Sequence, residues 1–332
     1  MRILLTGGAG YVGSACLRWL IKHGHEPVAF DNLSEGNPPA VPDDRLIVGD
    51  ILDTDPLAQA MRDSGAEAVM HFAALALVSD SINEPDRYWQ NNLMGTRSVL
   101  EAMRQAEVNR ILFSSTCATY AFGAEMPITE ETPQKPQTPY GTTKLAAENI
   151  IRDYARAFGF GCTLLRYFNA SGADPDGQFG EDHTHETHLI PLILQAAVGR
   201  RDKVTLYGTD WPTPDGTCVR DFVHTDDLAQ AHQLAIEALQ PGEDRLYNIG
   251  TGVGTTVMQV LKACEKAAGR PIPHELADRR PGDPATLVAS SARIRHELGW
   301  DPQYTDINKT VATAWKWHNA NPDGYAKDPV QN

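Results

Sequence analysis

The sequence predicts an α/β fold in which a doubly wound parallel sheet is joined to a smaller, partly interleaved α/β domain. Short apolar segments alternate with helical segments through the first half of the chain, and a glycine-rich turn, Gly7 to Gly13, directly follows the first apolar segment. Strands that alternate with helices form parallel sheets with helices on both faces. After Phe168 the chain becomes rich in glycine, aspartate and histidine, which indicates a second domain.

The first sheet is predicted from short apolar segments bounded by polar or turn residues, a pattern typical of strands buried on both faces. The longest helices are expected over Asp86–Ala106 and Tyr140–Phe158, and a shorter one over about Val12–His23. The six predicted strands are Arg2–Leu5, Pro27–Phe30, Arg45–Val48, Ala68–His71, Arg110–Ser114 and Cys162–Arg166.

Shorter elements are predicted in the second half. A helix is expected near Pro191–Val198 and a strand near Val204–Tyr207. A helix over Asp226–Leu239 and a strand over Arg245–Ile249 are expected to return to the first sheet. The predicted domains are residues 1–168 plus about 221–249, and residues 169–220 plus 250–332.

Composition excludes several classes of protein. The net charge of -14 over 332 residues argues against nucleic acid or an anionic membrane as the main partner. No apolar run approaches the ~18 residues that a membrane span needs. The five cysteines are scattered without a C-x-x-C pair, which indicates a reducing, cytoplasmic environment.

The glycine turn has the spacing Gly7-x-x-Gly10-x-x-Gly13 between a predicted strand and a predicted helix. This context is typical of a Rossmann-type dinucleotide site, in which the helix N-terminus faces the pyrophosphate. Asp31 ends the next strand, where a carboxylate accepts a ribose 2′-hydroxyl and repels a 2′-phosphate, so NAD is favoured over NADP. Asp50, after the third strand, is expected either to hold the adenine edge or to cap a helix.

Tyr140 and Lys144 are four residues apart on a predicted helix and therefore share one face. A neighbouring ammonium favours the phenolate, so we expect the pKa of Tyr140 to fall below its usual value. A phenolate beside a nicotinamide can oxidise an alcohol, since the phenolate takes the proton and the ring takes the hydride. Thr116, at the end of the fifth strand, could relay that proton; otherwise its hydroxyl satisfies its own turn.

These motifs identify the chain as similar to the extended short-chain dehydrogenase/reductases. The resemblance includes Thr6-Gly-Gly-Ala-Gly-Tyr-Val-Gly, His71-Phe-Ala-Ala, Tyr140-Gly-Thr-Thr-Lys and Arg166-Tyr-Phe-Asn. Later segments resemble one branch, the UDP-glucose 4-epimerases: Gly180-Glu-Asp, His188-Leu-Ile-Pro, Tyr207-Gly-Thr-Asp-Trp, Asp215-Gly-Thr-Cys-Val-Arg-Asp-Phe-Val-His and Arg279-Arg-Pro-Gly-Asp.

The resemblance implies residue roles. Tyr140 looks like the catalytic base, Lys144 its partner and Thr116 the third catalytic residue. The implied NAD site comprises Gly7, Gly10, Tyr11, Val12, Gly13, Asp31, Asn32, Asp50, Ile51, Phe72, Ala73, Ala74, Asn91, Ser114, Tyr140, Lys144 and Tyr167. The implied UDP-sugar site comprises Thr116, Tyr140, Phe168, Asn169, His188, Leu189, Tyr207, Arg220, Arg280, Asp283 and Leu287.

The implied reaction inverts C4 of a UDP-hexose, UDP-glucose or UDP-galactose, through a transient 4-keto sugar. Leu287, in the implied pocket wall, is of intermediate size, so UDP-N-acetylhexosamine and UDP-pentose stay open. Nucleotide-sugar dehydratases and decarboxylases carry carboxylates after the threonine, where this chain has Cys117 and Ala118. An NAD-binding sensor is disfavoured because such proteins typically lose the tyrosine or the lysine. Relatives dimerise through the two long helices, which implies a homodimer.

Two further patterns are set aside. His183, His185 and His188 cluster, but His185-Glu186 is followed by Leu189 where an H-E-x-x-H motif needs histidine, so no metal is expected. Gly250–Gly254 resembles a second phosphate loop but lacks another strand–helix unit with an acidic partner, so a structural turn is expected.

Overall fold

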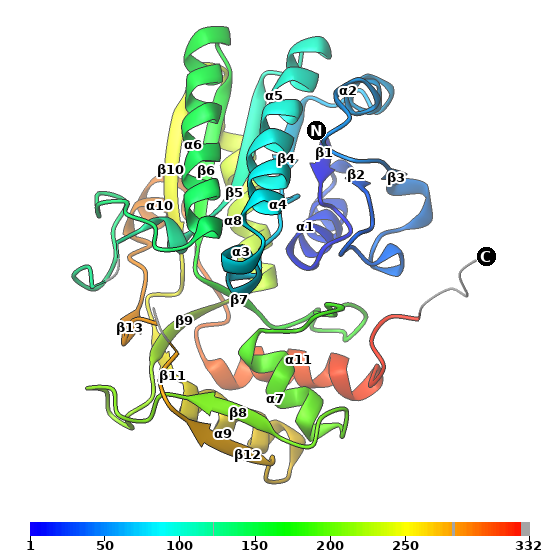
Figure 1. The fold of residues 1–332 in the computed structure, drawn as a ribbon. Coiled ribbons are helices and arrows are strands. Elements are labelled where there is room, and N and C mark those ends of the chain that lie inside the picture. The colour runs from blue at the N-terminus through cyan, green and yellow to red at the C-terminus, as the bar shows by residue number, and fades with distance from the viewer. Residues whose placement is uncertain (122, 281–282, 327–332) are drawn as a thin grey trace.

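The computed structural model describes residues 1–121, 123–280 and 283–326. A seven-stranded sheet has the order β10-β6-β5-β4-β1-β2-β3, and all its neighbouring strands are parallel (Figure 1). The six strands expected for the first sheet are confirmed, and the strand expected to return is its edge. The strands are β1 (Arg2–Thr6), β2 (Glu26–Asp31), β3 (Leu46–Val48), β4 (Ala68–His71), β5 (Arg110–Thr116), β6 (Gly161–Tyr167) and β10 (Asp244–Ile249).

Alternation along β1 shows why both faces of this sheet are covered. Ile3 and Leu5 point into one apolar cluster with side chains of α1 and α8, whereas Leu4 points into another with side chains of α2, α5 and α6. The doubly wound arrangement is thereby confirmed. These helices are α1 (Tyr11–Lys22), α2 (Thr54–Asp63), α5 (Gly95–Gln105), α6 (Pro139–Phe158) and α8 (Thr225–Ala238).

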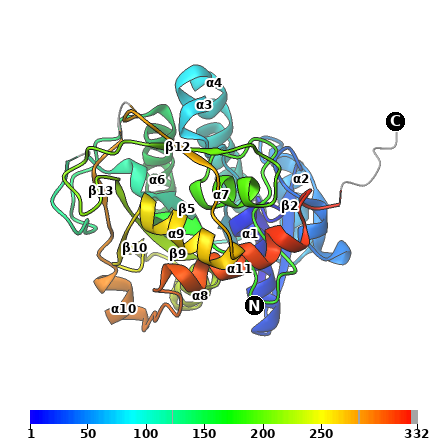
Figure 2. The ribbon, with the colours of Figure 1, turned by 90° about the horizontal axis from the view of Figure 1, so that it is seen from below.

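The rest of the chain builds two small sheets below the first. In one, β9 pairs with β7, β11 and β13; in the other, β8 pairs with β12. The helices α7, α9 and α11 pack on one another around a separate apolar cluster (Figure 2). The elements are β7 (Asn169–Ser171), α7 (Leu189–Ala197), β8 (Val204–Tyr207), β9 (Val219–His224), β11 (Gly254–Thr256), α9 (Val257–Ala268), β12 (His274–Ala277), β13 (Thr286–Leu287), α10 (Ala292–Leu298) and α11 (Ile307–Ala320).

The long helix expected over 86–106 is interrupted by a π-helical segment. It consists of α4 (Pro85–Tyr88), the π segment η3 (Trp89–Met94) and α5, all with right-handed helical backbone. Such segments widen one turn and redirect its side chains. Short elements complete the chain: η1 (Pro38–Ala40), η2 (Asp43–Arg45), α3 (Val78–Asn83) and η4 (Cys117–Thr119).

None of the helices in the described residues is both long and apolar enough to span a membrane. β9 joins the second sheet, and the chain then returns to the first through α8 and β10. The exact domain boundaries stay a prediction.

Candidate active site

The glycine turn between β1 and α1 is shaped for close approach. Gly7 has a φ of 72°, and a Cβ there would lie 2.5 Å from the Ala73 nitrogen. A Cβ on Gly13 would lie 2.2 Å from the Gly7 carbonyl oxygen. Gly10 is the N-cap of α1 and offers no side chain to the first backbone N–H groups. A helix start with free donors and no side chain over it fits a pyrophosphate.

Asp31 ends β2, as the sequence predicted, and lies beside this turn. Its carboxylate accepts hydrogen bonds from the backbone N–H of Ala9 (3.0 Å) and of Leu33 (2.8 Å). Burial raises the pKa of Asp31, and the two backbone donors oppose that rise. A buried carboxylate fixed at the end of β2 is the acceptor that the ribose hydroxyls of a dinucleotide require.

Asn32 and Asp50 meet beside Asp31. The Asn32 amide donates to Asp50 Oδ2 (2.9 Å), while the other Asp50 oxygen accepts from the Leu52 N–H (2.9 Å). Asp53, rather than Asp50, is the N-cap residue of α2. Of the two expectations for Asp50, the helix cap is therefore wrong. Its neighbour Ile51 is buried against the α5 glycine, Gly95.

The loop after β4 packs against the start of the glycine turn. The N–H groups of Phe72 and Ala73 both donate to the Thr6 carbonyl, at 2.9 and 3.0 Å, and Ala74 follows them in the same loop. Asn92, next to the predicted Asn91, exchanges two hydrogen bonds with the Leu75 backbone, at 2.8 and 2.9 Å.

Asn92 also donates to Thr143 of α6 (3.3 Å). The sequence pointed only to Asn91, whose amide donates to Asn92 (3.0 Å). The π segment explains the difference, because it turns Asn92 inward to join the cofactor loop to the helix that carries Tyr140.

Tyr140, Thr116 and Lys144 come together at the carboxyl edge of β5. The Thr116 hydroxyl is near enough to the Tyr140 phenol to lower its pKa, and it also accepts a hydrogen bond from the Ala118 N–H (3.1 Å). Lys144 Nζ donates to the Ser114 carbonyl oxygen (2.6 Å), and the Ser114 hydroxyl is hydrogen-bonded to Tyr167. The predicted proton relay and lysine thus lie together with two predicted cofactor residues.

The expected fall in the pKa of Tyr140 is wrong for the chain alone. Burial raises the pKa of Tyr140 above its usual value, and only the Thr116 hydrogen bond opposes that rise. Burial likewise lowers the pKa of Lys144 to about 7, although Glu148 acts against it. Because a buried ammonium is itself disfavoured, Lys144 alone cannot hold Tyr140 as a phenolate.

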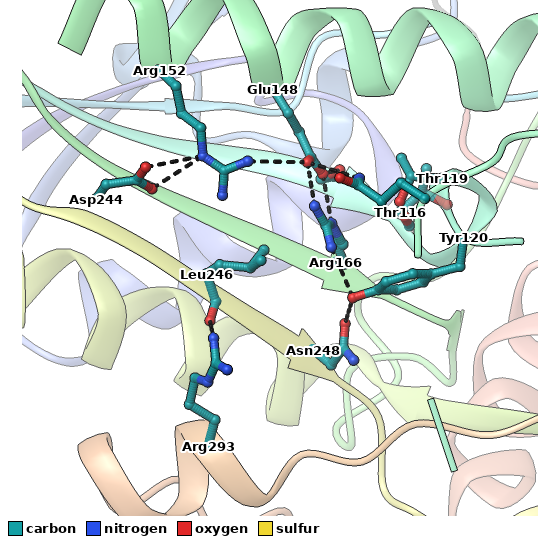
Figure 3. Close-up of polar contacts among 12 residues, drawn as sticks. Thr116, Thr119, Tyr120, Glu148, Arg152, Arg166, Asp244, Leu246, Asn248 and Arg293 are labelled. Atoms are coloured by element: carbon teal, nitrogen blue, oxygen red, sulfur yellow. Dashed lines mark hydrogen bonds and ion pairs between the residues drawn. The ribbon is translucent and has the colours of Figure 1, made fainter. Parts of the chain in front are cut away.

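A buried polar network behind this site was not predicted. Arg166 of β6 donates two hydrogen bonds to Glu148 of α6, at 2.8 and 2.5 Å, and a third to the Tyr120 hydroxyl (2.9 Å) (Figure 3). Tyr120 in turn donates to Asn248 of β10 (2.7 Å). Burial raises the pKa of Glu148, but the Arg166 guanidinium outweighs it and the net pKa is below the usual range. This network holds α6, and with it Tyr140, against β6 and β10.

The later predicted residues form a second group around β9 and β13. Arg220 lies 3.6 Å from Asp283 and pairs in register with Leu287. Arg280 lies 3.0 Å from Asp283 and 5.2 Å from the centre of the Tyr207 ring. Two guanidinium groups beside an exposed aromatic ring suit a nucleoside diphosphate.

Phe168 and Asn169 follow β6 directly and lead the chain from the residues around Tyr140 to those around β9. Phe168 packs in one cluster with Leu287 and Cys117. The side-chain oxygen of Asn169 is buried and has no hydrogen-bond partner among the described residues. His188 instead contacts Glu181 and Glu186, and Leu189 begins α7.

A glycine turn under the carboxyl edge of a parallel sheet, facing a tyrosine–lysine pair, defines a dinucleotide-binding enzyme of the Rossmann class. The chain belongs to the NAD dependent epimerase/dehydratase family, whose model matches residues 3–250.

Named relatives cover nearly the whole chain. A UDP-glucose 4-epimerase of Corynebacterium glutamicum is 49% identical over 321 residues, which is 96% of each chain. A crystal structure of a UDP-glucose 4-epimerase superposes with a TM-score of 0.95 at 43% identity, covering 98% of this chain and 100% of that one. Another, from Bifidobacterium longum in complex with NAD+ and UDP, has a TM-score of 0.93 at 37% identity and covers 98% and 100%.

Proposed function

We propose that this chain is an NAD-dependent epimerase that inverts C4 of a UDP-hexose and interconverts UDP-glucose and UDP-galactose. The observation that carries the proposal is the convergence of Tyr140, Thr116 and Lys144 at β5, two strands from a glycine turn in which Gly7 and Gly13 leave no room for a Cβ. The relatives named above carry this activity in their names.

The residues fit NAD. The glycine turn would receive the pyrophosphate, Asp31 the adenosine ribose, and Lys144 with Tyr167 the nicotinamide end. Bound NAD supplies a cationic ring that accepts hydrogen with its electron pair from C4. With Tyr140 as the phenolate beside that ring, Thr116 would accept the proton of the C4 hydroxyl while giving its own to Tyr140, and loss of the C4 hydrogen to the ring would leave a 4-keto sugar.

The substrate residues hold the diphosphate while the hexose turns. Arg220 and Arg280 supply planar donors to the two phosphates, and Tyr207 supplies a ring for the uracil. In the ligand-free chain Asp283 lies between the two arginines and keeps them in place. The keto sugar then presents its opposite face, and return of hydrogen and proton inverts C4.

The alternative reactions receive less support. A dehydratase or decarboxylase needs an acid–base group after Thr116, but burial raises the pKa of Cys117 to about 12 and keeps that thiol neutral. Leu287 packs beside Phe168, and its side chain is of intermediate size. UDP-N-acetylhexosamine or a UDP-pentose therefore stays the second candidate class of substrate.

We also propose a cytoplasmic homodimer. Apolar side chains are exposed on α3 and η3, namely Ile82 (62%), Met94 (41%) and Trp89 (38%). Both segments contact α4, and exposed apolar side chains on neighbouring segments are typical of an interface. The five free cysteines suit a reducing compartment.

The test is to assay the purified protein with UDP-galactose, UDP-N-acetylglucosamine and UDP-xylose. We expect the highest kcat/KM for UDP-galactose, and a fall of about 10²–10⁴ in kcat for Tyr140→Phe with NAD still bound. Wild-type turnover by Tyr140→Phe, or no epimerisation of any of the three sugars, would overturn the proposal.

A further inference from the structure

Four potential metal ligands converge on the loop that joins β7 to α7. They are Glu181, His183, Glu186 and His188, and one ligand atom of each lies within 4.8 Å of those of the others. No metal was expected from the sequence, because His185-Glu186 is followed by Leu189 and the H-E-x-x-H motif is incomplete. The structure uses a different spacing, E-x-H-x-x-E-x-H, on a loop rather than on a helix.

Three of the contacts between these side chains have the length of a tetrahedral edge, and a fourth is shorter. His183 Nδ1 lies 3.4 Å from Glu181 Oε1 and 3.3 Å from Glu186 Oε2, and His188 Nδ1 lies 3.4 Å from Glu186 Oε1 but 2.5 Å from Glu181 Oε1. Zinc bonds of about 2.0–2.1 Å at tetrahedral angles place neighbouring ligands about 3.3–3.4 Å apart.

Both histidines meet at one buried carboxylate oxygen. Glu181 is 4% exposed, and its Oε1 atom lies 2.5 Å from His188 Nδ1 and 3.4 Å from His183 Nδ1. A cation between the four groups would take the place of these ion pairs.

We propose that Glu181, His183, Glu186 and His188 bind one zinc ion. Two carboxylates balance the charge of a divalent cation, and two imidazoles with two carboxylates are a ligand set that zinc accepts. Since the protein fills all four positions, the ion stabilises the fold and takes no part in the C4 chemistry.

The ion would join parts of the chain that are far apart in sequence. Glu186 Oε1 is oriented by the N–H groups of Thr187 and His188, both at 2.8 Å. The His183 ring packs edge-on against Tyr11, the first residue of α1. His188 is the N-cap residue of α7. The metal thus ties the start of the cofactor helix to the start of α7.

The test uses the full-length protein with its bound cofactor, stripped of metal by a chelator and then dialysed against ZnCl2, MgCl2 or CoCl2. We expect about one zinc per chain in the wild type, a melting temperature about 3 °C or more higher with zinc, and no magnesium. Glu181→Gln and His183→Ala should lose both effects. His185→Ala changes an exposed histidine of the same loop and should keep both the zinc and the higher melting temperature.

Zinc bound equally by Glu181→Gln, His183→Ala and the wild type would overturn the proposal, since the ion would then lie elsewhere. So would a wild type that binds none, which would leave the four residues as ion pairs. If both variants fail to fold by circular dichroism, the cobalt-loaded wild type decides. Visible bands of tetrahedral cobalt support the site, and their absence contradicts it.

Discussion

Lys144 is a buried cation whose only hydrogen-bond acceptor among the described residues is the Ser114 carbonyl oxygen, at 2.6 Å. Burial lowers its pKa to about 7, against 10.5 for the free side chain. Below pH 7 Lys144 is charged in the native chain, and burial of that charge lowers the free energy of unfolding. Between pH 7 and 10.5 the unfolded chain binds more protons than the native one, so the contribution of Lys144 to stability rises with pH in that window.

Lys144→Met should remove this pH dependence. The difference in unfolding free energy between wild type and Lys144→Met should change in favour of the wild type by about 1.4 kcal/mol per pH unit at pH 8–9. Urea unfolding of both proteins at several pH values measures it. Parallel stability curves would show that Lys144 is not strongly desolvated.

The pKa of Tyr140 could not be predicted from the sequence. The spacing of Tyr140 and Lys144 predicted that the two side chains share one helix, and both lie on α6. It could not give the direction of the Tyr140 pKa, because desolvation depends on the whole surrounding chain. Burial outweighs the Thr116 hydrogen bond, which alone opposes it, and a bound cationic cofactor ring would favour the phenolate.

At the scale of elements, the β1–α1 turn depends on close approach at Gly7 as well as on its backbone angles. Gly7→Ala would place a methyl group 2.5 Å from the Ala73 nitrogen, at a φ of 72°. Gly24→Ala is the matched control, because Gly24 has a φ of 80° and nothing lies within 4 Å of its Cβ position.

We expect Gly7→Ala to lower the unfolding free energy by about 1–3 kcal/mol more than Gly24→Ala does, and to weaken NAD binding. Denaturant titration and cofactor retention on gel filtration measure the two effects. Equal costs for the two variants would show that the turn relaxes around the new methyl group.

A second prediction at this scale concerns α6, which is anchored by the Glu148–Arg166 pair. Glu148→Gln leaves a buried guanidinium without its carboxylate and should cost about 3–5 kcal/mol. Arg152→Ala removes a less buried partner, 3.9 Å from Glu148, and should cost about 1 kcal/mol or less. Chemical denaturation compares them, and a cost below that of Arg152→Ala for Glu148→Gln would contradict the anchoring role.

The elements were predicted where apolar periodicity was strong, as in the six strands and in α6. The π segment η3 was not, because it has the same composition as an ordinary helix. The Glu148–Arg166 network was also missed, since its members lie on α6, β6, β10 and just after η4, and no local pattern joins them.

At the scale of the whole molecule, the proposed dimer brings exposed apolar side chains of α3 and η3 against a second copy. Ile82→Glu should raise the dimer dissociation constant by at least about tenfold, because a charge at an apolar interface must be desolvated. Light scattering across micromolar concentrations measures the mass. A monomeric wild type would contradict the proposal.

The parallel, doubly wound arrangement of the large sheet followed from alternating strands and helices, whereas its strand order came only from the structure. The small sheets were less predictable, since β7, β9, β11 and β13 are short and pair across long sequence separations. The sequence nevertheless placed Arg220 and Arg280 in one group, through its resemblance to a family rather than through any periodicity.

The central claim is that the hydrogen taken from C4 is held by the bound cofactor and returned to the same carbon from the other side. The most direct measurement uses UDP-galactose labelled with deuterium at C4, in ordinary water, with the product examined by NMR. The account predicts UDP-glucose that retains its deuterium at C4. Product carrying a solvent proton at C4 would contradict it.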